Sequence, residues 1–330
     1  MKKTILLTIF LFSLLFGAAS KELTEQRNQL FEKLKTIHNL SDAQIKKIRA
    51  IIEKSPAMSQ GLPGVAKHPR TEIECSTKLA SSGISYENKD YEKICGAKYM
   101  APVYKKGTNP EDAKMCIDQF EFPNIPCEYP LIWVTARDAA LICEAEGKRL
   151  CDAHEWEGAC AGSLEETDYY FNLVDNYTTA AAKMRVPHNK KREVVWAYGK
   201  EYRPELCGTG VAKTQNCDKA NLNGSGVMKS CGSNHFPAGF FPECRSSFGV
   251  YDQHGNAAEH MNLPTKPSEM TSRGGHGVVE MKGSWFVFGK KTVPHLDDCR
   301  WRAPFWHGTK VMDLKSHANY HLGFRCCKSR

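Results

Sequence analysis

The feature that most constrains this chain is a set of 14 cysteines, all of which follow an apolar N-terminal segment. Lys2 and Lys3 precede an apolar run from Ile5 to Phe16, and the small residues Gly17-Ala-Ala-Ser20 come next. A basic start, a short apolar run and small residues are the parts of a secretory signal. An even number of cysteines in an exported chain predicts that disulfides staple the fold.

We therefore expect an exported protein, periplasmic or secreted, in which residues 1–20 are a signal peptide cleaved near Ser20. The apolar run is shorter than the roughly 20 residues that a membrane-spanning helix requires. Since no other stretch approaches that length, the mature chain is not expected to span a membrane.

The spacing of the cysteines favours disulfides over zinc sites, because the sequence has no close pair of the C-x-x-C type. Cys326 and Cys327 are adjacent, and the geometry of a bond between neighbours is strained. We therefore expect these two residues to pair with separate partners. A local disulfide between Cys75 and Cys95 is one option that the sequence leaves open.

The overall charge gives no indication of a nucleic-acid ligand. The formal net charge of +8 falls to +6 once Lys2 and Lys3 are removed with the signal. No run of Lys and Arg is interleaved with aromatic residues, which is the pattern expected of a nucleic-acid groove.

The segment before residue 56 predicts a helical hairpin, which we place at residues 21–55. Its second helix begins at the capping box Ser41-Asp-Ala-Gln44. Each helix has one apolar stripe, which must be buried against the main domain or against a partner. Residues 56–100 are rich in Pro and Gly at their start and are expected to form a linker or strap.

Residues 101–330 are expected to form one α+β domain. Thr135 caps a helix that runs from Ala136 to Glu146, and Asp152-Ala-His-Glu155 is a capping box that opens another. After Gly162 the helical periodicity fades. Loops and short strands are expected there, the strands at Val194–Tyr198, Gly249–Tyr251, Ser284–Phe288 and His321–Cys326.

Asn256 and Glu259 follow a turn at Gly255, three residues apart. Amide and carboxylate oxygens of this kind suit Ca²⁺, a hard cation. The alternative is an ordinary turn with a surface glutamate.

Several short motifs occur in a fixed order in the C-terminal two thirds of the chain. They are Cys116-Ile-Asp118, Gly147-Lys-Arg-Leu150, Glu155-Trp-Glu157, Phe248-Gly-Val-Tyr-Asp252, Gly255-Asn-Ala-Ala-Glu259, Lys282-Gly-Ser-Trp285 and Leu322-Gly-Phe-Arg-Cys326. In this order they resemble the formylglycine-generating enzyme family, also called the sulfatase-modifying factor domain. The resemblance implies a variant of the C-type-lectin-like fold, with little regular secondary structure and bound calcium.

The resemblance also implies particular pairs and ligands. It implies disulfides between Cys143 and Cys326 and between Cys160 and Cys299. It implies a calcium site at Asn256 and Glu259 and a second one at Asn221 and Leu222. The family's turn usually continues as W-E-W, whereas this chain has Ala258-Glu259-His260.

Family enzymes oxidise a sulfatase cysteine to formylglycine with Cu(I) held by two thiolates, which a soft ion prefers. Those cysteines follow the G-S-W strand, but here Gly283 to Thr292 contains no cysteine. Cys299 is the only cysteine between Gly283 and Cys326, and the implied disulfide already uses it. Copper is therefore not an expected cofactor, because one remaining sulfur cannot form a dithiolate site.

Two other groups of side chains lie in the same region. His295, Asp297, His307 and His321 have the residue types that bind Zn²⁺, Cu²⁺ or iron. The alternative is that they are polar loop residues that bind no metal. Aromatic and Arg side chains suggest a stacking surface for a sugar or peptide, with a packed aromatic core as the alternative: Trp301, Arg302 and Trp306.

The sequence thus predicts an exported protein of this family that binds a ligand, with a protein or peptide as the expected class. Two alternatives stay open: an oxidoreductase whose His and Asp residues replace the two catalytic cysteines, and an envelope scaffold that uses the hairpin to dock a partner.

Overall fold

The computed structural model describes residues 20–173, 177–213, 232–289, 297–304 and 309–330. It contains helices and two sheets, so the expected α+β class is confirmed. Within the described part of the chain, no helix is both long and apolar enough to cross a membrane. The expected signal peptide lies outside the described residues except for Ser20, whose Oγ accepts a hydrogen bond from the N–H of Leu23. Cleavage after Ser20 would remove this cap.

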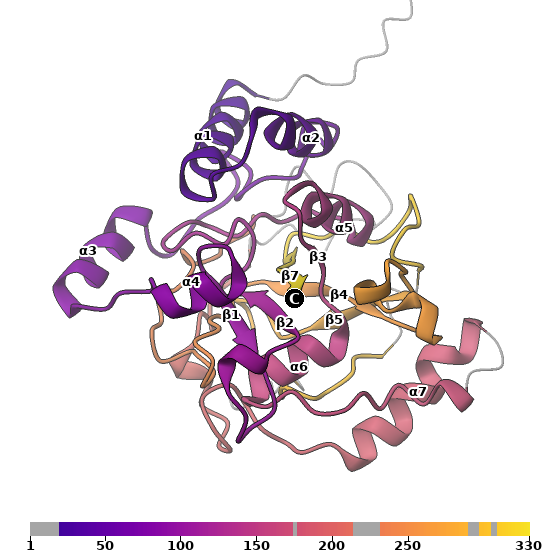
Figure 1. Ribbon diagram of the computed structural model, residues 1–330. Coiled ribbons are helices and arrows are strands. Elements are labelled where there is room, and N and C mark those ends of the chain that lie inside the picture. The colour runs from indigo at the N-terminus through magenta and orange to yellow at the C-terminus, as the bar shows by residue number, and fades with distance from the viewer. Residues whose placement is uncertain (1–19, 174–176, 214–231, 290–296, 305–308) are drawn as a thin grey trace, which may run out of the picture.

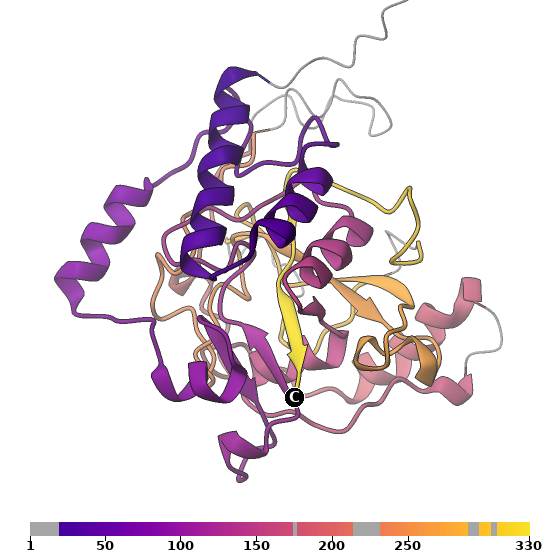
Figure 2. The ribbon, with the colours of Figure 1, turned by 45° about the horizontal axis from the view of Figure 1, so that its top comes forward.

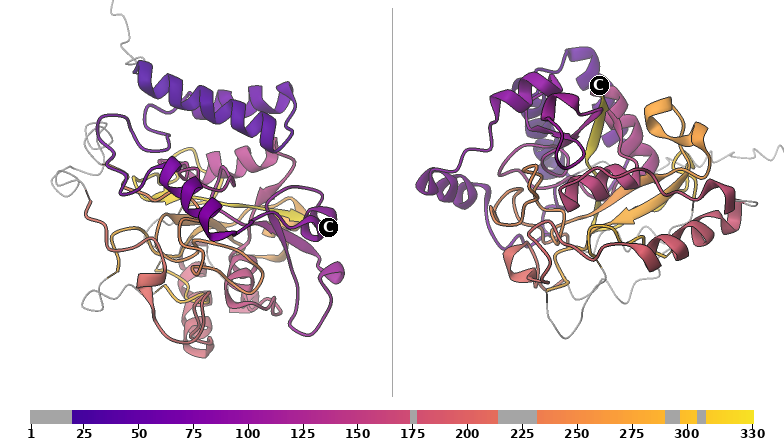
Figure 3. Two further views of the ribbon diagram at one scale, coloured as in Figure 1. Left: turned by 90° about the vertical axis from the view of Figure 1, so that its left-hand side faces the viewer. Right: turned by 60° about the horizontal axis from the view of Figure 1, so that its bottom comes forward.

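The N-terminal hairpin consists of α1 (Lys21–Ile37) and α2 (Asp42–Ile52), and its expected capping box at Ser41 is present. The apolar stripes of both helices belong to one core cluster with α5 (Ala136–Ala145), and α2 packs directly on α5. Leu34, Ile48 and Ile52 are fully buried there. Burial of each such side chain stabilises the fold by about 1.5–3 kcal/mol. The stripes therefore cover the main domain, on the side opposite α7 (Figure 1; Figure 3, left).

The segment expected to be a linker contains two helices, α3 (Glu72–Ser82) and α4 (Lys89–Cys95). Thr71 and Glu74 form a capping box that opens α3, a signal that the low periodicity around it concealed. The suggested bond between Cys75 and Cys95 is wrong. Cys75 bonds to Cys127 and Cys95 bonds to Cys116, because α4 packs on β1 (Met100–Val103) and lies beside the neighbouring strand β2 (Met115–Asp118), which carries Cys116.

The first sheet has the strand order β1-β2-β7-β3, and all of its pairs are antiparallel. Strand β7 crosses the centre of the molecule, where it is drawn in yellow (Figure 2). Successive side chains of a strand point to opposite faces. Cys326 and Cys327 on β7 therefore reach different partners, Cys143 and Cys151, which confirms that they do not pair with each other. The strands are β1 (Met100–Val103), β2 (Met115–Asp118), β3 (Arg149–Leu150) and β7 (Cys326–Ser329).

The second sheet has the order β5-β4-β6, with β4 antiparallel to β5 and parallel to β6. Several expected strands are absent from the described residues: 194–198 and 249–251 form only isolated bridges, and 284–288 forms a turn. Val195, Val250 and Phe286 of these loops are nevertheless buried in core clusters. The strands of this sheet are β4 (Ala258–Leu263), β5 (Val278–Lys282) and β6 (Leu322–Gly323).

Two further helices border the candidate site. The capping box at Asp152 and Glu155 opens α6 (Ala153–Ala161) as expected. Helix α7 (Tyr177–Lys191) was not expected, because it contains Pro187 and has no apolar periodicity. Short 3₁₀ segments complete the fold at Pro110–Asp112, Phe171–Leu173, Pro204–Leu206, Pro267–Glu269 and Thr271–Arg273.

Candidate functional site

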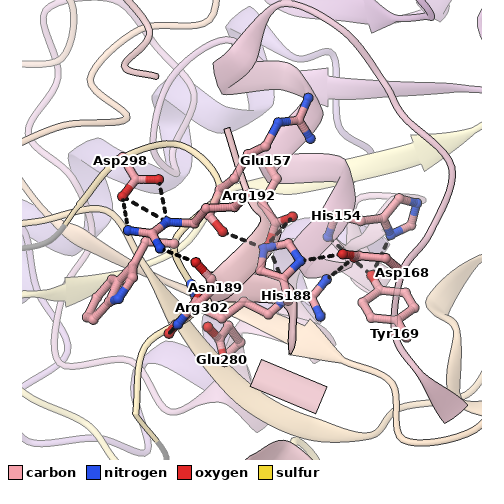
Figure 4. Close-up of polar contacts among 12 residues, drawn as sticks. His154, Glu157, Asp168, Tyr169, His188, Asn189, Arg192, Glu280, Asp298 and Arg302 are labelled. Carbon is pink, nitrogen blue, oxygen red and sulfur yellow. Dashed lines mark hydrogen bonds and ion pairs between the residues drawn. The ribbon is translucent and has the colours of Figure 1, made fainter. Parts of the chain in front are cut away.

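A pocket of about 210 Å³ lies between α6, α7 and the segment around Arg300. Its lining is charged and carries both signs, as Figure 4 shows for part of it. The lining comprises His154, Glu157, Glu165, Glu166, Asp168, His188, Lys191, Arg192, Glu193 and Arg300.

Glu157, on α6, is a buried residue of this pocket's lining. One of its oxygens, Oε1, lies 2.6 Å from Nζ of Lys282 on β5 and 3.3 Å from Nε of Arg302. Burial alone would raise the pKa of Glu157, but the charges of Lys282 and Arg302 lower it to about 2. A buried carboxylate therefore stays ionised between two buried cations.

Helix α7 is attached to this network through polar contacts at its C-terminal end. Nδ1 of His188 lies 2.7 Å from Oδ2 of Asp168, and Oδ1 of Asp168 accepts a hydrogen bond from Arg302 at 3.0 Å. Asn189 exchanges two hydrogen bonds with the backbone of Arg302, both of 2.9 Å. Arg192, just after the end of α7, donates hydrogen bonds to both oxygens of Asp298 (Figure 4). The Asp168 side chain is 41% exposed, so the network reaches solvent at this point.

Glu280, whose Oε1 lies 3.9 Å from Nζ of Lys282, has a much higher pKa than Glu157. Its Oε1 accepts a hydrogen bond from the backbone N–H of Ala303 at 2.7 Å. Burial raises the pKa of Glu280 to about 7, although the charges of Lys282 and Arg302 act in the opposite direction. The cluster therefore contains one carboxylate that changes charge near neutral pH.

A second polar cluster, around His254 and Asp297, is buried and shares no residue with the lining of this pocket. Ser284 donates to Asp297 at 2.6 Å, and Nε1 of Trp196 donates to the same carboxylate at 3.2 Å. Nδ1 of His254 lies 3.7 Å from Asp297. Burial would raise the pKa of Asp297, but the nearby His254 ring and hydrogen bonds from Ser284 and Trp196 hold it below its ordinary value. Nε2 of His254 faces the disulfide between Cys160 and Cys299.

The two disulfides that the family resemblance implies are both present in the structure: Cys143 bonds to Cys326, and Cys160 bonds to Cys299. Every cysteine among the described residues is in a disulfide. Cys217 and Cys231 lie outside the described residues.

Both residues of the expected calcium turn are buried and have protein partners. Glu259 forms a two-point ion pair with Arg325, at 2.6 and 2.7 Å, and accepts a hydrogen bond from Nε1 of Trp156. Oδ1 of Asn256 accepts from the backbone N–H of Phe236 at 2.8 Å. A cation at this turn would compete with these contacts, and calcium binding stays a prediction. Asn221 and Leu222 lie outside the described residues.

The histidine and aspartate set is only partly described, because His295 and His307 lie outside the described residues. Asp297 belongs to the buried cluster with His254. His321 stacks on Trp285, with ring centroids 4.0 Å apart. In the part of the chain that the structure describes, Asp297 and His321 are not brought together in any group with metal-binding spacing.

The expected stacking surface is likewise partly described, since Trp306 lies outside the described residues. Trp301 and Arg302 are buried, and Arg302 pairs with Glu157 and Asp168. Neither side chain therefore lies on an exposed surface. Arg302 holds two lining residues of the pocket, Glu157 and Asp168, in place.

Sequence reasoning did not identify Glu157, Asp168 or His188 as a group. Glu157 was visible as part of the E-W-E motif, but its partners Lys282 and Arg302 are more than a hundred residues away. His188 had no signal, because the helix that carries it was not predicted.

Comparison with known proteins gives one family. The family model described as "Sulfatase-modifying factor enzyme 1-like domain" matches residues 86–330. No curated protein matches the chain. Among solved structures, "Crystal Structure of CarF" shows 12% sequence identity and a TM-score of 0.37, and the match covers 70% of this chain and 97% of that one.

Proposed function

This chain belongs to the family of sulfatase-modifying factor enzyme 1-like domains, and we propose that it is an exported member that binds a peptide or protein ligand instead of oxidising a cysteine. Its ligand site is the pocket between α6 and α7. Its structure is held by disulfides, which is consistent with export.

The observation that carries this proposal is the bond between Cys160 and Cys299. Cys299 is the only cysteine between Gly283 and Cys326. With its sulfur in a disulfide, this stretch offers no thiolate to Cu(I), and the family's oxidation needs two. Membership of a family does not carry an activity without the residues that perform it.

The charge arrangement of the pocket supports a peptide ligand. Lys191 and Arg300 offer cations at its wall, and Glu165, Glu166 and Glu193 offer carboxylates. Glu157 and Asp168 hold fixed positions through their ion pairs with Arg302, so the pocket is organised before a ligand arrives. The backbone of a peptide offers a C=O acceptor and, except at proline, an N–H donor at each residue. It can therefore bond to both the cationic and the anionic side chains of the wall.

The proposal is tested by screening the immobilised, unreduced protein against a random peptide library. Enriched peptides are expected to bind the Glu166→Ala, Arg300→Ala double variant about ten-fold more weakly, or worse. Lys47→Ala on α2, which is exposed on the opposite side of the domain, is the matched control and keeps full affinity.

The same preparation is incubated with Cu(I), oxygen and a cysteine peptide of the sulfatase type, and the peptide mass is then measured. The proposal expects an unchanged cysteine. Conversion to formylglycine, or peptide binding that the pocket variant leaves intact, would refute it.

A further inference from the structure

A pocket of about 350 Å³, here named the α4 pocket, lies beside the start of α4. It is formed by residues 85–91, Gln119 and the segment 245–251. Its volume lies in the range of about 300–1,000 Å³ that is usual for small-molecule sites. It shares no residue with the pocket beside α7, which has about 210 Å³. The α4 pocket is therefore a separate place on the molecule, which the peptide-binding proposal does not use.

The lining of the α4 pocket is polar but carries little charge. Among the twelve described residues that line it, six end in a hydroxyl group and two, Asn88 and Gln119, in an amide. Glu87 and Arg245 are the charged residues of this lining and have opposite signs, and Phe248 is its one wholly apolar side chain. The residues with a hydroxyl group are Ser85, Tyr86, Tyr91, Ser246, Ser247 and Tyr251.

Contacts within the protein hold the inner wall of this pocket in place. Nε2 of Gln119 donates to the backbone oxygen of Gly249 at 2.8 Å, and the backbone N–H of Tyr251 donates to the backbone oxygen of Gln119 at 2.7 Å. The hydroxyl of Tyr86 donates to the backbone oxygen of Gly239, and its ring packs edge-on against that of Tyr251 with centroids 4.7 Å apart. A wall that is organised before binding lowers the entropy cost of holding a ligand.

Two side chains of the pocket are left for a ligand to contact. Arg245 and Ser247 are both exposed. Within the described part of the chain, Arg245 forms no ion pair with a carboxylate and Oγ of Ser247 has no hydrogen-bond partner. The pocket therefore combines a fixed inner wall with an accessible donor at Arg245 and an accessible hydroxyl at Ser247.

We propose that the α4 pocket binds an uncharged saccharide. A sugar hydroxyl both donates and accepts hydrogen bonds, as the hydroxyls of Ser and Tyr do, so the ligand and the lining can pair in either direction. An anion would be repelled by Glu87 and a cation by Arg245, which favours a ligand without charge. The tyrosine rings add apolar surface for the C–H groups of a sugar ring. The volume, near the lower end of the usual range, sets the bound part at about one or two sugar units.

The test titrates the full, unreduced chain with glucose, galactose, mannose, N-acetylglucosamine, maltose and lactose, and measures binding by ligand-observed NMR. Glucuronate and triglycine are the charged and peptide arms of the same experiment. At least one neutral sugar is expected to bind, and the double variant Arg245→Ala, Ser247→Ala is expected to bind it about ten-fold more weakly. The double variant Ser272→Ala, Arg273→Ala makes the same two changes at exposed residues outside the pocket and keeps the wild-type affinity.

The proposal is overturned if none of the neutral sugars binds, or if glucuronate or triglycine binds more tightly than all of them. It is also overturned if the Arg245 and Ser247 variant binds as well as its control. Should that variant fail to fold, the amide resonances of the wild type decide. Shifts at Ser247 and Gly249 on addition of the sugar support the proposal, and shifts confined to other residues refute it. None of these outcomes bears on peptide binding beside α7, because the two linings have no residue in common.

Discussion

Two polar clusters of this domain share helix α6 but are built on different physical principles. Glu157 belongs to the charged cluster beside α7, and Cys160, three residues later, belongs to the closed cluster around His254. The charged cluster satisfies buried ions by pairing them, as Glu157 does with Lys282 and Arg302. The closed cluster instead uses a disulfide, hydrogen bonds and a single carboxylate, Asp297.

The two clusters therefore differ in whether a ligand from solvent can reach them. Ion pairs organise a pocket that opens to solvent at Asp168, where charged groups of a ligand can enter. In the other cluster, His254, Asp297 and the Cys160–Cys299 disulfide are buried, so they lie out of reach of a ligand at the surface. Variants that remove one group from each cluster show how much the ion pairs and the hydrogen bonds each contribute to folding stability.

The largest effect is expected from Glu157→Gln. Two buried cations, Lys282 and Arg302, then lose their shared carboxylate, and breaking a buried ion pair in this way costs about 3–5 kcal/mol. Urea unfolding of the disulfide-intact protein measures the change. Glu165→Gln, on the exposed wall of the same pocket, is the control and is expected to change stability by less than about 0.5 kcal/mol. A loss below about 1 kcal/mol for Glu157→Gln would show that the pairs are not the support described here.

Asp297→Asn tests the closed cluster and is expected to cost about 1–3 kcal/mol. The amide keeps one acceptor for Ser284 and Trp196 but loses the charge that faces Nδ1 of His254. Thermal unfolding at pH 7 measures the loss, with Asp313→Asn on an exposed loop as the matched control. Equal unfolding temperatures for wild type and Asp297→Asn would contradict a role for this carboxylate.

The pH dependence of stability sharpens the contrast, because Glu280 of the charged cluster has a pKa of about 7 against an ordinary value of 4.5. The folded chain therefore binds more protons than the unfolded chain between these values, and the stability contributed by Glu280 falls as pH rises through this window. Wild type is expected to lose on the order of 2 kcal/mol relative to Glu280→Gln between pH 5 and 8. Parallel stability curves for the two proteins would disprove this assignment.

The smallest effect is expected at the exposed edge. Asp168→Asn removes a carboxylate that is 41% exposed, so its pairs with His188 and Arg302 are screened by water and contribute less than about 1 kcal/mol. Peptide affinity is expected to fall more than stability does, since Asp168 lines the pocket. A stability loss comparable with that of Glu157→Gln would contradict the distinction between the buried Glu157 and the partly exposed Asp168.

Local signals in the sequence predicted the local structure well. The capping boxes at Ser41 and Asp152 and the cap at Thr135 each open a helix as expected. These signals depend on residues three apart, which a single sequence displays directly. Helix α7 lacks such a signal. It is held to the domain by polar contacts of His188, Asn189 and the adjoining Arg192 with residues distant in the chain, which local sequence patterns do not reveal.

Pairings between distant residues were predicted only where family motifs supplied them. The Cys143 and Cys160 pairs followed from motif order, whereas chain proximity suggested the wrong partner for Cys95. Glu259 was expected to face a cation, and it does face a positive charge, that of Arg325, 66 residues away. A single sequence gives the residue types of such a pair but not the folding that brings them together.

The central claim is that this sulfatase-modifying factor enzyme 1-like domain holds its described cysteines in disulfides. Alkylation of native, unreduced protein, followed by peptide mapping and Cu(I) titration, tests it most directly. We predict no label on the cysteines of the six disulfides and no stoichiometric Cu(I) at Cys299. Labelling of Cys299 together with uptake of one Cu(I) per chain, lost in Cys299→Ser, would contradict the account.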